Sequence, residues 1–367
     1  MDRKIKILVI SNYNSAVVSR PEAEIFLGLS KRDYEITVMT YDGSEYTNRF
    51  REAGIRVIDF HPEKKFNRGE IRIISDELKS GGYDILMLFN SEAIYNGIQA
   101  AKGIDVRVVL YRGYSANVNW FDPTDYLKFL HPRVDHIICN SIGVKEMFDR
   151  QLFFRKDKAV VINKGHDVSW YDKEEALDIK SELGIPEESF LLVSVANNRR
   201  MKGIPYLLKG FIGLPENTSI HLLLVGRDMD TSGNLKLIQG AHNEKNVHFV
   251  GYRNDSLRVV KACDVFVLAS LFGESITKSV IEAMSLGVAP IITDIAGNRE
   301  LVVDGENGLV VPKANSSAIT EAILKLYNDR ELSAQFGANS RKRIQTALSK
   351  EETVENYDRF YRSIVFS

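Results

Sequence analysis

The segment 269–287, ASLFGESITKSVIEAMSLG, has the side chains best suited to chemistry in this sequence. Its Gly-Glu-Ser turn precedes a helical pattern that we expect to begin with Ser275 as the N-cap and to end at Gly287. The free amides of residues about 276 to 278 would then point outward at the positive end of the helix dipole, and Lys278 adds a full charge. Such a helix start predicts a diphosphate site.

Two glutamates accompany this helix start, Glu274 just before it and Glu282 two turns into it. Carboxylates placed there would accept hydrogen bonds from vicinal hydroxyls, as on a ribose or a hexose. The alternative is that Glu282 only forms an ion pair on the surface of the helix.

A second turn of interest, in the segment 194–211, gathers Arg199, Arg200 and Lys202 ahead of Gly203. Cations at such a turn suit a diphosphate whose charge grows as it leaves. The alternative is a solvated basic turn, but two turns suited to phosphate in one half of the chain favour a ligand site.

The elements that must position these turns follow from short β-branched runs that alternate with helical patterns. This rhythm predicts parallel sheets with crossover helices, in which ligands bind beyond the carboxyl ends of the strands. The strands are expected at 4–11, 36–42, 56–60, 85–90, 107–112, 136–141 and 159–165, and then at 190–197, 220–226, 247–251, 265–270, 289–293 and 308–311. The rhythm restarts after the seventh run, which predicts an α/β chain of two doubly wound units.

The polar and aromatic stretch 165–176 is the expected boundary between them. We assign residues 1–168 to the first domain and 169–349 to the second. The last segment, 350–367, reads as a helix with an aromatic stripe and no strand after it, so we expect it to cross back to the first domain.

The composition argues against some classes of partner and indicates a compartment. The 367 residues include 48 Lys and Arg against 49 Asp and Glu, a net charge of −1 that argues against a nucleic-acid partner. Cys139 and Cys263 lie in apolar runs without metal-ligand spacing and are expected to be core thiols of a reduced compartment. The first residues show neither an export signal nor a membrane span, which predicts a cytoplasmic protein.

Six motifs follow one another between residues 190 and 312: RRMKG, LLLVG, VHFVG, ACDVFVLAS, GESITKSVIEA and DGENGLVV. This series resembles the donor-binding domain of the retaining glycosyltransferases of family 4 (glycosyl transferases group 1), which have the GT-B fold. The first half resembles the family more loosely, through its opening strand, YDILML and INKGHD. The resemblance implies two Rossmann-like domains facing a cleft that holds the active site.

The resemblance also implies the activity. A sugar would pass from a nucleotide-diphosphate sugar to a hydroxyl of a glycan or lipid-linked acceptor in polysaccharide biosynthesis, with retention of anomeric configuration. The sugar nucleotide would be a substrate of this hexosyltransferase, and neither a cofactor nor a metal would be required. Two other classes stay open: a nucleotide-sugar epimerase of the same fold, and a catalytically silent subunit that binds sugar nucleotides. The oligomeric state stays open as well.

Site residues carry over where the motifs match. Lys202 would neutralise the diphosphate, Glu274 would lie beside the donor sugar, and Glu282 would hold the ribose hydroxyls. The other donor-binding residues are Asn197, Arg199, Arg200, Gly226, Ile276, Thr277 and Lys278.

Three departures from the family pattern qualify these assignments. Asn197 stands where the family has an arginine, so Arg199 or Arg200 must substitute or the contact is lost. Arg112 stands where the family often has histidine, and as the third catalytic candidate it would contact the donor phosphate or an acidic acceptor. The glycine-rich first loop is replaced by SNYNSAVVSRPEAE. The candidate acceptor-binding residues are Asn12, Arg20 and Asn117.

Other features are less specific. The run 228–230, Asp-Met-Asp, is similar to a metal motif of a different fold but lacks its arrangement, so no metal is expected. His131 reads as a packing residue at a helix end, or alternatively as an acceptor contact. The segment 144–160 mixes cations with bulky apolar residues, as in an interfacial helix that would give a weak peripheral contact with the inner membrane surface. The alternative is the ordinary last helix of the first domain.

Overall fold

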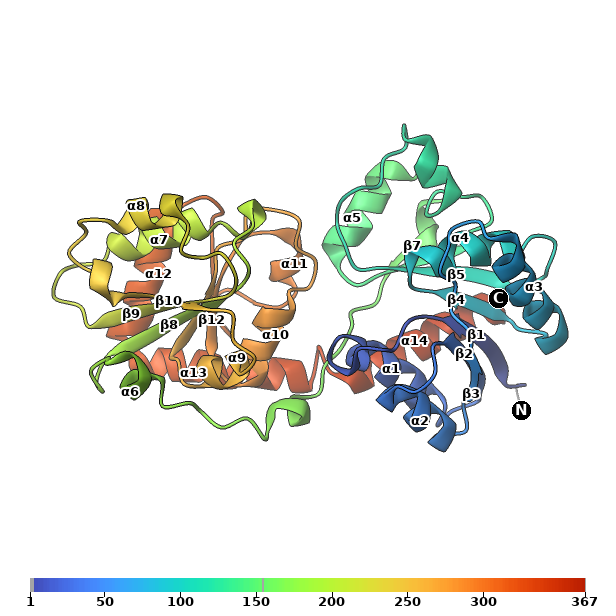
Figure 1. Ribbon diagram of the computed structural model, residues 1–367, viewed down its shortest axis with the longest axis horizontal. Coiled ribbons are helices and arrows are strands. Elements are labelled where there is room, and N and C mark those ends of the chain that lie inside the picture. The colour runs from blue at the N-terminus through green and yellow to red at the C-terminus, as the bar shows by residue number, and fades with distance from the viewer. Residues whose placement is uncertain (1–2, 154, 367) are drawn as a thin grey trace. The chain divides into compact units, whose positions relative to one another are not determined.

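The computed structural model describes residues 3–153 and 155–366. The chain divides into two compact units, Met1–Gly165 with Lys350–Ser367, and His166–Ser349 (Figure 1). Each unit is built on one parallel sheet with helices around it. The predicted α/β class with two doubly wound units is confirmed.

The first unit has a seven-stranded sheet in the order β3-β2-β1-β4-β5-β6-β7. Its strands are β1 (Ile5–Ile10), β2 (Tyr34–Thr40), β3 (Arg56–Asp59), β4 (Ile85–Leu88), β5 (Arg107–Arg112), β6 (His136–Cys139) and β7 (Ala159–Val161). Its helices are α1 (Ala16–Leu29), α2 (Glu45–Glu52), α3 (Arg68–Gly81), α4 (Ser91–Ala100), α5 (Ile142–Gln151) and α14 (Lys350–Val365), with short 3-10 turns η1 (Pro123–Leu127) and η2 (Lys156–Lys158).

The second unit has a six-stranded sheet in the order β10-β9-β8-β11-β12-β13. Its strands are β8 (Phe190–Val195), β9 (Ile220–Val225), β10 (Val247–Gly251), β11 (Val265–Leu268), β12 (Ala289–Thr293) and β13 (Leu309–Val311). Its helices are α6 (Ile179–Leu183), α7 (Ile204–Ile212), α8 (Ser232–Ile238), α9 (Ser256–Lys261), α10 (Lys278–Ser285), α11 (Ala296–Arg299), α12 (Ser316–Asn328) and α13 (Arg330–Gln345), with 3-10 turns η3 (Val168–Tyr171), η4 (Arg200–Lys202) and η5 (Glu244–Asn246).

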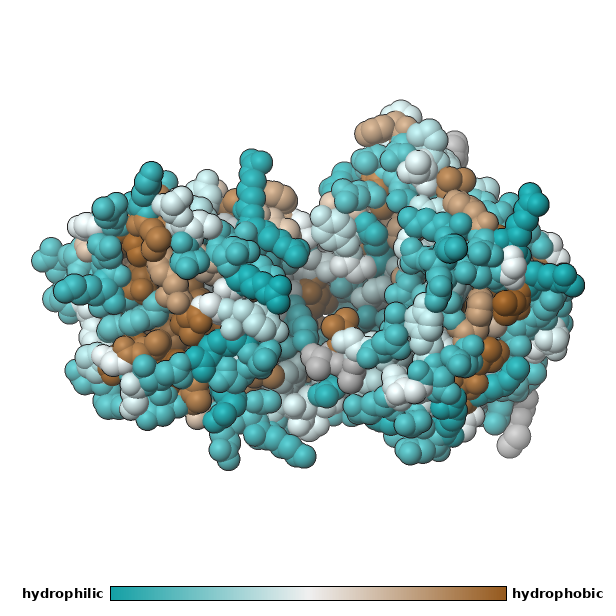
Figure 2. All heavy atoms as spheres, in the orientation of Figure 1, coloured by the Kyte–Doolittle hydropathy of each residue, from teal (hydrophilic) through white to brown (hydrophobic). Residues whose placement is uncertain are grey.

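Both faces of each sheet are buried, which explains why the strands read as continuous apolar runs. In β1, Leu8 and Ile10 belong to one core cluster while Ile7 and Val9 belong to another, because successive side chains point to opposite faces. The second sheet repeats this arrangement. The face drawn in Figure 2 is mostly hydrophilic, with hydrophobic residues in separate patches.

The segment 144–160 proves to contain most of α5 together with the residues that lead into β7. Met147, Phe148 and Leu152 are buried in the core, so they are not available to a membrane, and the interpretation as an interfacial helix is wrong for these residues. Phe154 lies outside the described residues. Within residues 3–153 and 155–366, every helix falls short of the length and apolar character that crossing a membrane requires.

The C-terminal helix α14 packs against α1 of the first unit, as the sequence predicted (Figure 1). Its aromatic stripe supplies Tyr357 and Tyr361, which are fully buried with rings 5.5 Å apart. Covering one face of the first sheet therefore depends on a segment from the far end of the chain.

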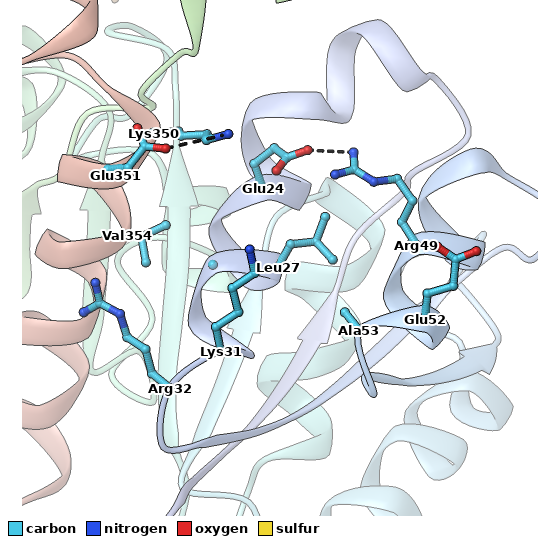
Figure 3. Close-up of a pocket in the computed structure, with 11 residues that line it drawn as sticks. Glu24, Leu27, Lys31, Arg32, Arg49, Glu52, Ala53, Lys350, Glu351 and Val354 are labelled. Atoms are coloured by element: carbon cyan, nitrogen blue, oxygen red, sulfur yellow. Dashed lines mark ion pairs between the residues drawn. The ribbon is translucent and has the colours of Figure 1, made fainter. Parts of the chain in front are cut away.

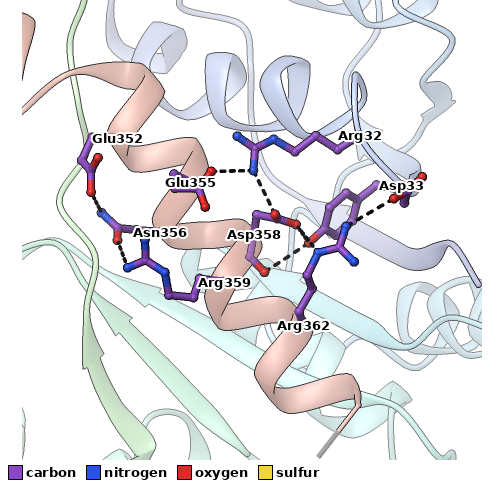
Figure 4. A network of polar contacts seen from close by, with 9 residues as sticks. Arg32, Asp33, Glu352, Glu355, Asn356, Asp358, Arg359 and Arg362 are labelled. Carbon is purple, nitrogen blue, oxygen red and sulfur yellow. Dashed lines mark hydrogen bonds and ion pairs between the residues drawn. The ribbon is translucent and has the colours of Figure 1, made fainter. Parts of the chain in front are cut away.

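A network of hydrogen bonds and ion pairs connects the middle of α14 to Arg32 and Tyr34 of the first unit (Figure 4). The Asp358 carboxylate accepts hydrogen bonds from the Tyr34 hydroxyl at 2.6 Å, from Arg32 at 2.9 Å and from Arg362 at 2.9 Å. Burial alone would raise the pKa of Asp358, but these hydrogen bonds outweigh it and hold the pKa below its ordinary value.

We expect Asp358→Asn to lower the stability of the first unit by about 1–2 kcal/mol, roughly 2–8 °C in the thermal midpoint, because it removes a charged acceptor. A carboxylate whose pKa is lowered on folding stabilises above its unfolded value of about 3.9 and loses that contribution as the pH falls through the folded value. Calorimetry should therefore show a constant deficit from pH 8 to pH 5 that shrinks below about pH 4.

Arg359→Gln is the matched control, since Arg359 is exposed on the same helix and its one hydrogen bond within residues 3–153 and 155–366 is to Asn356 (Figure 4). It should change the midpoint little. Equal effects of the two substitutions would contradict the role of Asp358.

Candidate active site

The second sheet reverses its strand order between β8 and β11, which are hydrogen-bonded neighbours. In a doubly wound sheet the connections leaving two such strands diverge and leave a crevice at their carboxyl ends, where ligands bind. The turn after β8 contains Lys202, and the turn after β11 contains Glu274. The two turns singled out from the sequence thus belong to neighbouring strands at one edge of the sheet.

Lys202 and Glu274 form an ion pair across these two turns through Nζ and Oε1. Both side chains are largely buried, with 16% and 11% of their surface exposed. The same Glu274 oxygen accepts a hydrogen bond from the Ser270 hydroxyl at 3.0 Å. Because a charge-assisted bond strengthens away from water, this pair fixes the separation of the turns.

Two backbone contacts bring these turns together, and one of them depends on a glycine. Gly203 has φ of +63°, and a Cβ there would lie 2.0 Å from the carbonyl oxygen of Ala269. The amide of Leu271 donates to the Met201 carbonyl at 2.7 Å. Only glycine permits both the left-handed conformation and the close approach at position 203.

The helix after β11 begins two residues later than predicted. The N-cap of α10 is Thr277 rather than Ser275, and Gly287 follows the helix with φ of +79°. Ser275 is kept out of the helix because its carbonyl lies against Gly297 of α11, where a Cβ would come within 1.9 Å. The amides that open the helix are therefore those of Lys278 and Ser279, which have no partner one turn earlier in the helix.

Residues that the sequence analysis missed support this turn from α11. Asn298 is fully buried, donates to the Thr293 carbonyl at 3.1 Å, and has its Oδ1 3.5 Å from the Thr277 hydroxyl. Thr277 is buried, while Ile276 is partly exposed. The position of Gly297 and Asn298 just beyond strand β12 is the sequence signal that could have found them.

Glu282 pairs with Lys278 at 3.1 Å, one turn away on α10. This is the ion pair that the sequence analysis offered as the alternative for Glu282. Its side chain is only 17% exposed, and burial raises the pKa of Glu282 while the Lys278 charge opposes the rise. A largely buried carboxylate that has one ion-pair partner among the described residues, with that partner half-exposed, keeps acceptor capacity for a hydroxyl ligand.

The remaining donor-site candidates surround the turn after β8. Asn197, Arg199 and Arg200 are exposed, and the Asn197 carbonyl Oδ1 accepts from the amide of Arg227 at 3.2 Å. Gly226, with φ of +148°, lies so close to Ala196 that a Cβ would come within 1.7 Å of its carbonyl oxygen. Gly226 thus shapes the backbone, and the cationic candidates on this turn are Arg199 and Arg200.

The Asp-Met-Asp run, residues 228–230, has one side chain in the core and two on the surface. Met229 is buried in the core, while Asp228 and Asp230 are exposed and Asp228 has φ of +58°. Across residues 3–153 and 155–366, no three His, Cys, Asp or Glu side chains come together as a metal site would require. Cys139 and Cys263 are buried and free, and burial raises the pKa of Cys139 to about 12.

In the first unit the strand order reverses between β1 and β4, and Asn12 lies at that point. Its amide donates to Asn90 Oδ1 at 2.8 Å. Arg20 is partly exposed on α1, and Asn117 is exposed with φ of +61°. His131 accepts from the amide of Arg133 at 3.0 Å, a local bond that fits the packing interpretation.

Arg112, at the end of β5, holds the loop that follows it. Its Nε donates to the Tyr114 carbonyl at 2.9 Å, its Nη2 donates to the Ala116 carbonyl at 2.5 Å, and its guanidinium lies 4.9 Å from the Phe129 ring centroid. Burial lowers the pKa of Arg112, while Asp125 raises it. Two of its donor nitrogens are therefore already bonded to backbone carbonyls. One of these carbonyls, that of Ala116, directly precedes the predicted acceptor residue Asn117.

One pocket of the first unit, of about 590 Å³, lies along α1, α2 and α14 (Figure 3). Its lining comes from the second half of α1, from the end of α2 and from the start of α14, and not from the carboxyl ends of the strands. Its charges largely pair with one another, as Arg49 does with Glu24 at 2.6 Å and Lys350 with Glu351 at 3.7 Å. This pocket therefore offers less to a charged ligand than the strand ends do.

Comparison with known proteins assigns the family. The model of glycosyl transferases group 1 matches residues 175–343, and that of glycosyltransferase family 4 matches residues 23–170. The chain belongs to the group 1 glycosyltransferases.

Related glycosyltransferases differ in how much of the chain they match. N-acetyl-alpha-D-glucosaminyl L-malate synthase of Bacillus anthracis is 26% identical over 195 residues, 53% of this chain and about half (51%) of that protein. N,N'-diacetylbacillosaminyl-diphospho-undecaprenol alpha-1,3-N-acetylgalactosaminyltransferase of Campylobacter jejuni is 25% identical and matches 93% of this chain and 94% of its own length.

Solved structures show the same GT-B fold. A glycosyltransferase from Rickettsia africae superposes with a TM-score of 0.79 at 17% identity, over 99% of both chains. Anabaena HepE, solved in complex with UDP, gives 0.73 at 18% identity over 98% of this chain and all of that one.

The glycine contact between the turns yields a prediction for this glycosyltransferase. Gly203→Ala should cost more than about 2 kcal/mol, because it adds a clash with a backbone carbonyl to the cost of a left-handed alanine. Gly240→Ala is the control: φ is +77° there, but nothing lies within 4 Å of the added Cβ. It should cost only about 1–2 kcal/mol. Thermal unfolding of both variants measures the difference, and equal midpoints would contradict the close approach.

Proposed function

We propose that this chain transfers a sugar from a nucleoside diphosphate sugar to a hydroxyl of a glycan or lipid-linked acceptor, with retention of anomeric configuration. The second unit would bind the donor and the first the acceptor. The observation that carries the proposal is the buried Lys202–Glu274 pair at the strand-order reversal of the second sheet, next to the opening of α10.

On donor binding, Lys202 and Glu274 would separate, and each would bind a different group of the same substrate. The Lys202 ammonium would move onto the diphosphate, with the opening amides of α10 and the positive end of its dipole beside it. Glu274, released from Lys202, would accept a hydrogen bond from a hydroxyl of the donor sugar. Each charge would thus exchange its partner rather than lose it, so the desolvation cost of binding is limited.

Glu282 would hold the ribose in the same way. Its pair with Lys278 is on one helix and partly exposed on the lysine side, so Lys278 can turn toward a phosphate while Glu282 accepts from vicinal hydroxyls. Arg199 and Arg200 would supply the cationic contact that Asn197 cannot.

The chemical step needs no nucleophile from the protein. The acceptor oxygen would bond to the anomeric carbon on the face from which the leaving group departs, and the bond from that carbon to the diphosphate oxygen would break with its electron pair. The acceptor proton would pass to a donor phosphate oxygen. The protein would position the reactants and stabilise the charge growing on the diphosphate, and no metal takes part in this scheme.

The relatives support these substrate classes. Anabaena HepE was solved with UDP and with UDP-glucose, and the Campylobacter jejuni relative is named for a diphospho-undecaprenol acceptor. A uridine diphosphate sugar as donor and a diphospho-undecaprenol-linked saccharide as acceptor are therefore the first substrates to test.

Lys202→Ala should lower the rate of sugar transfer by about 10² or more, because it removes the cation facing the leaving diphosphate. Lys209→Ala is the control, since Lys209 is exposed on the following helix α7. Released nucleoside diphosphate gives the rate, and NMR of the first-formed product gives its anomeric configuration. Wild-type rates for Lys202→Ala would contradict the role of Lys202, and an inverted product would contradict retention.

A further inference from the structure

A second pocket, of about 310 Å³, lies at the carboxyl ends of β4 and β5 in the first unit. This edge of the sheet is adjacent to the strand-order reversal between β1 and β4, where a doubly wound sheet binds ligands. Its volume is within the range of small-molecule sites. The lining residues that matter here are Lys65, Ser91, Tyr95, Arg112, Lys128 and Phe129.

The charged side chains that line this pocket are all positive. It includes three cations, Lys65, Arg112 and Lys128, and no carboxylate. Lys128 pairs with the buried Asp125 at 2.9 Å. For Lys65 and Arg112, no carboxylate of the described chain lies within ion-pair distance. The pocket is thus short of negative charge, in contrast to the self-paired charges of the pocket beside α14.

Neutral donors add to the cations. Ser91 opens α4, a helix of ten residues whose N-cap Asn90 makes no side-chain capping bond. Asn90 instead accepts from the amide of Asn12 and lies 3.1 Å from His61 Nε2, so the opening amides of α4 have no capping oxygen from Asn90. Amides at a helix start favour an anion. Arg112 also keeps Nη1 free of any partner within the described residues, since only its Nε and Nη2 bond to carbonyls.

The rest of the lining is aromatic. Tyr95 and Phe129 are buried, with Lys65 5.1 Å from the Tyr95 centroid and Arg112 4.9 Å from the Phe129 centroid. These rings lie against the two cations and help to hold them at the pocket, where they can bind a charged substituent.

We propose that this pocket selects an acceptor saccharide that carries an anionic group, a phosphate or a carboxylate, and that Lys65 is a specificity-determining residue for that group. The inference rests on the proposed function, in that it names the class of acceptor. Lys65 itself is exposed and outside the donor site.

The test compares 4-nitrophenyl β-D-glucuronide with 4-nitrophenyl β-D-glucoside, which differ only at C6, a carboxylate in the first and a hydroxymethyl group in the second. Titration calorimetry on the full chain at low salt should give about tenfold tighter binding of the glucuronide, the effect of one charge-assisted hydrogen bond. Lys65→Met should reduce that preference to about threefold or less, and Lys65→Arg should restore it. The exposed Lys79→Met on α3 should leave it unchanged.

Competition by 4-nitrophenyl phosphate separates the two anion sources. If it displaces the glucuronide at lower concentration than free glucuronate does, the preferred group is a phosphate, and in the reverse order it is a carboxylate. Absence of glucuronide binding, equal binding of the two glycosides, or an unchanged preference in Lys65→Met would overturn the proposal.

UDP binding measured on the same samples keeps this inference separate from the donor assignment. Lys65→Met should bind UDP as the wild type does. Equal binding of the glycosides with UDP binding intact would overturn the anionic pocket alone, whereas failure of the wild type to bind any nucleoside diphosphate would count against the proposed function.

Discussion

The candidate active site depends on one ion pair, between Lys202 and Glu274. Two opposite charges removed from most of their solvent must find each other, and the partners here come from turns 72 residues apart in sequence. Their pairing is possible because β8 and β11 are neighbours whose connections diverge, and because Gly203 allows the turns to touch. A ligand that offers an anion to the lysine and a hydroxyl to the glutamate can replace the pair, and a nucleoside diphosphate sugar offers both.

The first unit also has a strand-order reversal in its sheet, but different residues lie there. At its strand-order reversal, the amide of Asn12 after β1 donates a hydrogen bond to the side chain of Asn90 after β4. The adjacent pocket is lined by cations and aromatic rings. Sheet order decides where each site lies, and the side chains that follow the strands decide what each site can bind. The long α14 contributes by completing one core of the first unit, where its side chains pack with those of the central strands.

The sequence predicted what is encoded locally. Strands in β-branched runs, the helix starts at the turns and the returning C-terminal helix were predictable, since buried parallel strands and amphipathic helices have distinct periods. Pairing was not: the partner of Lys202, the buried Asn298 and the displacement of the α10 N-cap to Thr277 all depend on distant segments that pack together. Arg112 shows the same limit, because its capture by the carbonyls of Tyr114 and Ala116 depends on the path of a loop.

The central claim is that the strand-order reversal of the second sheet is a nucleoside diphosphate site. Its most direct test is a thermal-shift series of the wild type, Lys202→Met and Glu282→Gln with UDP, ADP, GDP and the matching free nucleosides. A ligand at 100 times its dissociation constant stabilises by about 2.7 kcal/mol. The account predicts that one diphosphate shifts the wild type, that Lys202→Met loses most of this shift while keeping any response to the nucleoside, and that Glu282→Gln weakens both. Unshifted wild type, or variants that respond as the wild type does, would contradict it.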